Sequence, residues 1–110
     1  MSIPSDPLHL RLKWDNPHTG ENYECVNQLP ITIGRAASLN GIVLNNKLVS
    51  RQHARLEGSD DKIVIIDQDS TNGTFVDGCR VERATLNEGA SFKIGPFTFI
   101  SFSCTPVNLK

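Results

Sequence analysis

Hydrophobic and polar residues alternate with a period of two along much of the chain. Residues 8–14 read Leu-His-Leu-Arg-Leu-Lys-Trp, and because successive side chains of a strand point to opposite faces, this pattern predicts a strand with one buried face. Similar patterns predict strands at 23–29, 31–33, 41–44, 52–57, 62–66, 74–76, 79–81, 91–94 and 97–104. Only residues 80–88 show helix-like spacing, and it is weak. The chain is therefore expected to be all-β.

Turn-forming residues separate nearly all of these segments. They occur at Asn16-Pro17, Gly58-Ser59-Asp60-Asp61, Asn87-Glu88-Gly89 and Gly95-Pro96. Asp77-Gly78 stands alone between two short strands and predicts a type I′ hairpin, because both residues tolerate a positive φ. About ten short strands with such closely spaced turns favour a β-sandwich.

Length and composition indicate one ordinary globular domain. The chain has 110 residues, 38% hydrophobic and 21% charged, which is enough to build a single core. We expect the domain to occupy residues 8–104, between tails at 1–7 and 105–110 that are rich in Pro and polar residues. The first residues lack the basic and apolar regions of a signal peptide. Three separated cysteines without a Cys-x-x-Cys pair then indicate reduced thiols in a cytoplasmic protein.

Charge and chemistry narrow the classes of partner. Net charge is −1, so the chain has no overall attraction for nucleic acid or for an anionic membrane, and any anion site must be local. Apolar runs such as residues 63–66 are strand-sized and too short to span a bilayer. The three histidines share no metal-ligand spacing. We expect no metal, cofactor, nucleic-acid, membrane or small-molecule partner.

Two polar segments lie where predicted strands give way to loops. Arg35 and the run Ser50-Arg51-Gln52-His53 form the first, and residues 69–75 form the second. They supply a guanidinium, hydroxyls and an amide, which are groups that hold a phosphate monoester without cleaving it. Because loops at one end of a sandwich commonly carry function, the two segments predict a binding site for a phosphorylated peptide.

The order and spacing of these residues resemble those of the forkhead-associated (FHA) domain. The matching motifs are Gly34-Arg35, Ser50-Arg51-x-His53, Asp67-x-x-Ser70-x-Asn72-Gly73-Thr74, Leu86-x-x-Gly89 and Ile94-Gly95. The resemblance covers residues 8–103 and implies a sandwich of about eleven mostly antiparallel strands. It also implies apical loops that bind phosphothreonine peptides, in an adaptor of kinase signalling. Residues 36–40 vary freely in the family, so no role is expected for them.

The resemblance implies a role for each residue of the ligand set. Arg35 would be the principal phosphate ligand, since its planar fork can donate two parallel hydrogen bonds. Ser50 would donate its hydroxyl to the phosphate, and Arg51 would add a further donor. Thr71 would help to hold the phosphothreonine. Asn72, which can donate and accept at once, would bind the peptide backbone.

Other residues would support or tune the site. Gly34 would permit tight backbone geometry beside Arg35, and the resemblance implies that His53, Asp67, Ser70 and Gly73 stabilise the loops. Residues 47–55 carry three cations and no acid, which suggests a positive rim that includes Lys47 and Arg55. Leu48, two residues before the site serine, predicts an apolar rather than an acidic third residue after the phosphothreonine. Lys47 beside it favours the opposite.

Two other functions compete with this interpretation. The first is a phosphate-independent interaction or assembly domain that uses a sheet face. Arg35, Ser50 and Asn72 argue against it as the sole role, because scaffolding would not require all three. The second is a hydrolase with Ser50 as nucleophile, His53 as base and Asp67 or Asp69 as orienting acid. It lacks a Gly-x-Ser-x-Gly elbow around the serine, so we expect a threonine-phosphorylated protein or peptide as partner and no enzyme activity.

Overall fold

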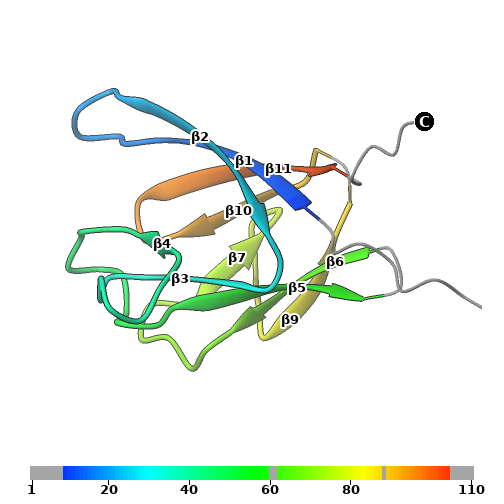
Figure 1. Cartoon of the computed structure of the whole chain (residues 1–110). Coiled ribbons are helices and arrows are strands. Elements are labelled where there is room, and N and C mark those ends of the chain that lie inside the picture. The colour runs from blue at the N-terminus through cyan, green and yellow to red at the C-terminus, as the bar shows by residue number, and fades with distance from the viewer. Residues whose placement is uncertain (1–8, 60–61, 88, 105–110) are drawn as a thin grey trace, which may run out of the picture.

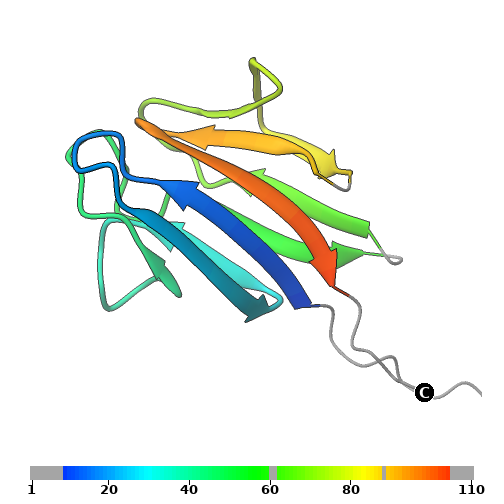
Figure 2. The same cartoon turned by 90° about the horizontal axis from the view of Figure 1, so that it is seen from above.

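Two β-sheets pack face to face in the computed structural model, which describes residues 9–59, 62–87 and 89–104 (Figure 1). The larger sheet has the strand order β2-β1-β11-β10-β7-β8 and is antiparallel throughout. Its strands are β1 (His9–Asp15), β2 (Asn22–Gln28), β7 (Thr74–Val76), β8 (Cys79–Val81), β10 (Ser91–Ile94) and β11 (Phe97–Cys104). From above, four strands of this sheet, β2, β1, β11 and β10, lie side by side as one twisted layer (Figure 2).

The smaller sheet has the order β4-β3-β5-β6-β9. Its strands are β3 (Ile31–Gly34), β4 (Ile42–Val43), β5 (Ala54–Ser59), β6 (Lys62–Asp67) and β9 (Arg83–Leu86). Only the pair β3–β4 is parallel. The prediction of a mostly antiparallel β-sandwich of about eleven strands is therefore confirmed. Among the described residues, no helix is long and apolar enough to cross a membrane.

The core lies between the inner faces of the two sheets. Phe92 and Phe99 from neighbouring strands stack with their ring centroids 4.9 Å apart, opposite Ile33, Leu56 and Ile65 of the smaller sheet, and all five are fully buried. Burying side chains of this size contributes about 1.5–3 kcal/mol each. The period of two in the sequence thus aligns one face of each strand with this layer.

Two local predictions have different outcomes. The hairpin joining β7 and β8 has a positive φ at both Asp77 (51°) and Gly78 (85°), which confirms the type I′ turn. In contrast, the helix-like spacing at 80–88 produces no helix over the described residues 80–87. The segment continues β8 to Val81 and then forms β9, whose Leu86 is buried opposite Ile63. Pairing with β6 outweighs a weak local pattern.

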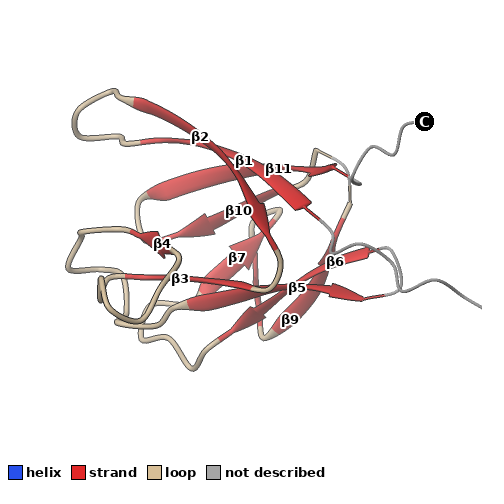
Figure 3. Cartoon of the chain, in the orientation of Figure 1, coloured by secondary structure: helices blue, strands red, loops and turns tan. Residues whose placement is uncertain are grey.

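Loops gather at one end of the sandwich (Figure 3). The loops are β3–β4 (35–41), β4–β5 (44–53), β6–β7 (68–73) and the β10–β11 turn at Gly95-Pro96. The first and last described residues, His9 and Cys104, pair with each other near the other end (Figure 1). The strand that was predicted at 52–57 begins two residues later in the structure, at Ala54. Gln52 and His53 consequently belong to the β4–β5 loop.

Candidate functional site

Arg35 follows the end of β3 and is held by the β4–β5 loop. Its backbone N–H donates to the carbonyl of Ser50 (3.0 Å), and its Nε donates to the carbonyl of Val49 (3.0 Å). The side chain is exposed, and its two terminal nitrogens have no partner within the described part of the chain. The fork is therefore anchored at its inner nitrogen, and its outer donors are available to a ligand.

Gly34 allows the β3–β4 and β4–β5 loops to come close together. A Cβ at this position would lie 2.3 Å from the carbonyl oxygen of Arg51 and 2.8 Å from the Asn40 amide. That amide donates to the carbonyls of Ala36 (2.7 Å) and Arg51 (2.6 Å). No role was expected for residues 36–40 from the sequence. Asn40 was missed because its partners are brought to it only by the fold.

His53 is fully buried and connects two loops through backbone groups. Its Nδ1 accepts the N–H of Ser50 (3.1 Å), so the ring proton lies on Nε2, which donates to the carbonyl of Gly73 (2.8 Å). The hydroxyl oxygen of Ser50 accepts the N–H of Thr71 (3.0 Å). Both ring nitrogens are thus used by backbone groups, and neither serves as a base for the Ser50 hydroxyl. This geometry argues against the hydrolase hypothesis.

Asp67 organises the β6–β7 loop from the end of β6. Its carboxylate accepts the backbone N–H (3.0 Å) and hydroxyl (2.5 Å) of Ser70 and the hydroxyl of Thr74 (2.7 Å). Ser70 Oγ in turn accepts the N–H of Gly73 (3.0 Å). Burial by itself raises the pKa of Asp67, but the hydrogen bonds from Ser70 and Thr74 outweigh it and lower the pKa below its usual value. Thr74, fully buried, had not been singled out as a site residue.

Gly73 occupies a position that glycine fits best. Its φ is +91°, in the left-handed region. A Cβ here would also lie 2.7 Å from Nε of Arg80, whose side chain reaches across from β8. The same residue provides the carbonyl that His53 binds. Arg80 therefore covers the end of the β6–β7 loop at Gly73, and His53 supports the same residue by bonding its carbonyl.

Two further hydrogen bonds join the β4–β5 and β6–β7 loops, beside the bond from His53 to the Gly73 carbonyl and the bond from the Gln68 N–H to the His53 carbonyl. The N–H of Thr71 reaches Ser50 Oγ, and the side-chain amide of Asn72 donates to the carbonyl of Leu48 (2.9 Å). The fold thus brings Arg35, Ser50, Thr71 and Asn72 together from three loops. Asn72 uses one amide N–H in this bond. Its oxygen and second N–H are the groups that a peptide backbone could engage.

The remaining residues named from the sequence lie around this centre. Arg51 contributes its backbone carbonyl to the β3–β4 loop, accepting the N–H of Ala36 (3.2 Å), while its side chain is exposed. Lys47 and Leu48 are also exposed. The Arg51 and Lys47 side chains are therefore accessible from solvent.

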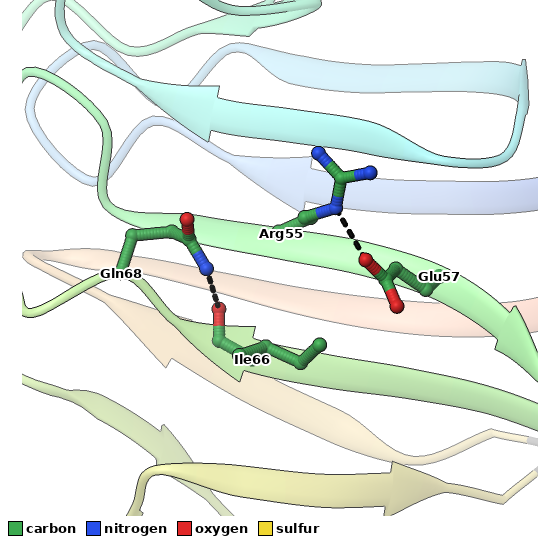
Figure 4. A network of polar contacts seen from close by, with 4 residues as sticks. All are labelled: Arg55, Glu57, Ile66 and Gln68. Carbon is green, nitrogen blue, oxygen red and sulfur yellow. Dashed lines mark hydrogen bonds and ion pairs between the residues drawn. The ribbon is translucent and has the colours of Figure 1, made fainter.

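Arg55 does not belong to this cluster. It lies within β5, where its Nε donates to the carboxylate of Glu57 two residues along the strand (Figure 4). On the neighbouring strand end, the amide of Gln68 donates to the Ile66 carbonyl (3.4 Å). The charge of Arg55 is offset by Glu57, so the cations left in the predicted positive rim over residues 47–55 are Lys47 and Arg51.

This set of loops agrees with the match to a protein family. The FHA domain model matches residues 31–95, which span β3 to the β10–β11 turn. The chain belongs to the FHA domain family. FHA domains are protein-interaction modules, and the matched region contains every site residue described above.

Known relatives support the same assignment. The chain is 45% identical over 65 residues to the ABC transporter ATP-binding/permease protein Rv1747 of Mycobacterium tuberculosis, covering 59% of this chain and 7% of that protein. It is 34% identical over 100 residues to the glycogen accumulation regulator GarA of Mycolicibacterium smegmatis, covering 89% of this chain. The chain spans 60% of the regulator's length.

A solved FHA structure shares the architecture of the whole sandwich. It comes from a structural and functional analysis of phosphothreonine-dependent FHA domain interactions, and it superposes with a TM-score of 0.73 at 25% identity. The match covers 90% of this chain and 99% of the other. The FHA fold is therefore shared along nearly the whole chain.

Proposed function

We propose that this FHA domain is a phosphothreonine-dependent binding module that acts as an adaptor in kinase signalling. The observation that carries the proposal is the anchored but outward-facing Arg35, whose backbone and Nε are fixed by the β4–β5 loop beside Ser50. The proposed partner is a threonine-phosphorylated protein in the cytoplasm. The related FHA domain studied for phosphothreonine-dependent interactions supports this choice of ligand.

The chemistry of the site suits a phosphate dianion. A phosphothreonine carries close to two negative charges at neutral pH and three acceptor oxygens. The two terminal nitrogens of Arg35 can donate in parallel to two of these oxygens. Ser50 Oγ accepts the N–H of Thr71, so its own O–H is directed to a further acceptor. Arg51 and the Thr71 hydroxyl are proposed as additional donors.

Rigid loops would favour binding in this geometry. His53, Asp67, Ser70 and Gly73 hold the loops through bonds that no ligand needs to replace. A ligand then meets donors that are already ordered, which reduces the entropy lost on association. A phosphothreonine peptide would bind more tightly than a phosphoserine peptide mainly because the threonine methyl group is buried. That burial contributes about 0.8 kcal/mol of binding free energy, or roughly fourfold in affinity.

The proposal is tested by fluorescence polarisation with a degenerate phosphothreonine peptide library. Matched phosphoserine and unphosphorylated libraries are measured in parallel. Binding should require the phosphate, and Arg35→Ala should weaken it by about a hundredfold or more, because an essential charge partner is removed. Arg83→Ala is the matched control, since Arg83 is an exposed arginine on β9. It should bind like the wild type.

The opposite result would support the phosphate-independent alternative. If peptides bind equally with and without phosphate, or if Arg35→Ala and Arg83→Ala behave alike, the loops are not a phosphate reader. A sheet face would then be the interaction surface.

A further inference from the structure

A groove leaves the proposed phosphopeptide site and runs along the outside of the larger sheet. This groove, called here the β7–β10 groove, has a volume of about 510 Å³. Its lining includes Leu48, Asn72, Phe75, Asp77, Lys93 and Thr98. The hydrogen bond between Asn72 and the Leu48 carbonyl is one of those that join the β4–β5 and β6–β7 loops. The groove therefore begins where the proposed site ends.

Strand register explains how the floor of the groove is formed. Lys93 on β10 is paired with Phe75 on β7 and with Thr98 on β11. Directly paired residues share a face of the sheet. Their neighbours Phe92 and Ile94 are buried in the core, so Phe75, Lys93 and Thr98 form a row on the outer face.

The end of the groove nearest the loops is apolar. Leu48 is 46% exposed, and a Cβ on Gly95 in the β10–β11 turn would lie 3.7 Å from the Cβ of Leu48. Phe75 is half-buried and presents its ring along the same surface. An exposed leucine and a partly exposed phenylalanine that line the same groove offer an apolar side chain a place to dock.

The groove has a positive charge at Lys93 and a negative charge at Asp77. Phe75 is paired with Lys93 on β10, which also lines the groove, and with Arg80 on β8, whose guanidinium lies against Gly73. Asp77, in the hairpin turn, is the anionic residue at the far end. An acidic group would be favoured beside Lys93 and disfavoured beside Asp77.

We propose that the polypeptide carrying the phosphothreonine continues along the β7–β10 groove. It places a large apolar side chain against Leu48 and Phe75 and a carboxylate beside Lys93. This inference rests on the proposed function and extends it by naming a second recognition surface and the partner's chemistry. Phe75, the sheet partner of Lys93, lies three positions after Asn72, and Asp77 lies five positions after it, so at about 3.3 Å per residue an extended partner needs roughly three residues beyond the loops to reach Lys93 and roughly five to reach the hairpin.

Two phosphothreonine peptide libraries of different length test the inference. The core library has two randomised residues on each side of the phosphothreonine, and the extended library has eight. Wild type should bind the extended library about tenfold more tightly and should enrich large apolar and acidic residues on one side. Lys93→Glu and Phe75→Thr should each remove that gain and leave the affinity for the core library unchanged.

A control variant and the core library distinguish failure of the groove proposal from failure of the proposed phosphopeptide function. Lys13→Glu reverses an exposed lysine on the same sheet, outside the groove, and should bind both libraries like the wild type. Equal affinity of wild type for the two libraries, or full extended binding by Lys93→Glu, would overturn the groove proposal while core binding leaves the proposed function intact. If the core library does not bind at all, the phosphopeptide function itself fails, and the groove proposal fails with it.

Discussion

At the scale of single residues, most polar side chains of the site form hydrogen bonds within the protein, which stabilise the loops. His53, Asn40 and Thr74 each bond a neighbouring loop or its anchor, and His53 and Thr74 are fully buried. Buried polar groups are costly unless they are paired, so these bonds fix one loop geometry. Arg35 differs because, among the described residues, its outer nitrogens bond no other group. The division between supporting and binding residues is thus chemical as well as spatial.

Asp67→Asn is expected to destabilise the domain by about 1–3 kcal/mol at pH 7, since the carboxylate accepts three hydrogen bonds. The pKa of Asp67 is lowered from its ordinary 3.8. Its stabilising effect is therefore complete above pH 3.8 and is lost as the pH falls through the lowered pKa. Urea unfolding at several pH values between 2 and 7 should show a shallower acid dependence for the variant than for the wild type.

Asp69→Asn provides the control for this pH effect. Asp69 is exposed, and its φ of +57° is one that asparagine tolerates. This variant should retain the acid dependence of the wild type. An Asp67→Asn protein that loses stability in acid as steeply as the wild type would show that another group carries the dependence.

At the scale of elements, short strands gain their position from turns and from pairing. The β7–β8 hairpin has three residues in each strand, and its two-residue turn is encoded locally by Asp77-Gly78. In contrast, β9 has no local signal and depends on its four pairs with β6. Arg80 on β8 then links the hairpin to the binding loops by covering Gly73. The hairpin turn should therefore influence the site as well as stability.

Gly78→Ala is expected to lower stability by about 1 kcal/mol, because the φ of +85° disfavours a side chain. A Cβ at this position would meet nothing within 4 Å, so any loss comes from backbone strain. Gly78→Asn is the matched variant, since asparagine adopts a positive φ more readily. Thermal unfolding should rank the wild type first, Asn second and Ala last. Equal stability of the two variants would exclude the backbone explanation.

At the scale of the whole molecule, the loops of the proposed site and the first and last described residues lie at opposite ends of the sandwich. Strand β1 begins and β11 ends near the end away from these loops, where His9 pairs with Cys104. The β7–β10 groove extends from the loop end along the larger sheet. Such an arrangement leaves the proposed site open when the domain is attached to other polypeptide.

A fluorescent protein fused to either end of the full chain should leave phosphopeptide affinity unchanged. The first and last described residues, His9 and Cys104, pair with each other away from the loops, which is the reason for this expectation. The control is a Gly-Ser insertion between Asn46 and Lys47 in the β4–β5 loop, which should abolish binding by separating Leu48 from Asn72. Polarisation titrations with the same peptide measure both. Loss of affinity in either fusion would place that end of the chain near the ligand.

The sequence by itself determined the strand pattern, the hairpin and the sandwich class. Those features depend on local properties, namely which side chains alternate and which residues accept a positive φ. It also identified the loop residues, through the order of short motifs that match the FHA family. Neither β9 nor the bonding of Arg55 to Glu57 could be predicted in this way.

Only the tertiary structure decided which residues meet. Asn40 bonds the carbonyl of Arg51, eleven positions away, and Asn72 bonds that of Leu48, twenty-four away. The row of Phe75, Lys93 and Thr98 exists because three strands pair in one register. A hydrogen bond or a groove between distant segments depends on how the sheets bring backbone groups together, and a period of two in the sequence carries no information about that distance.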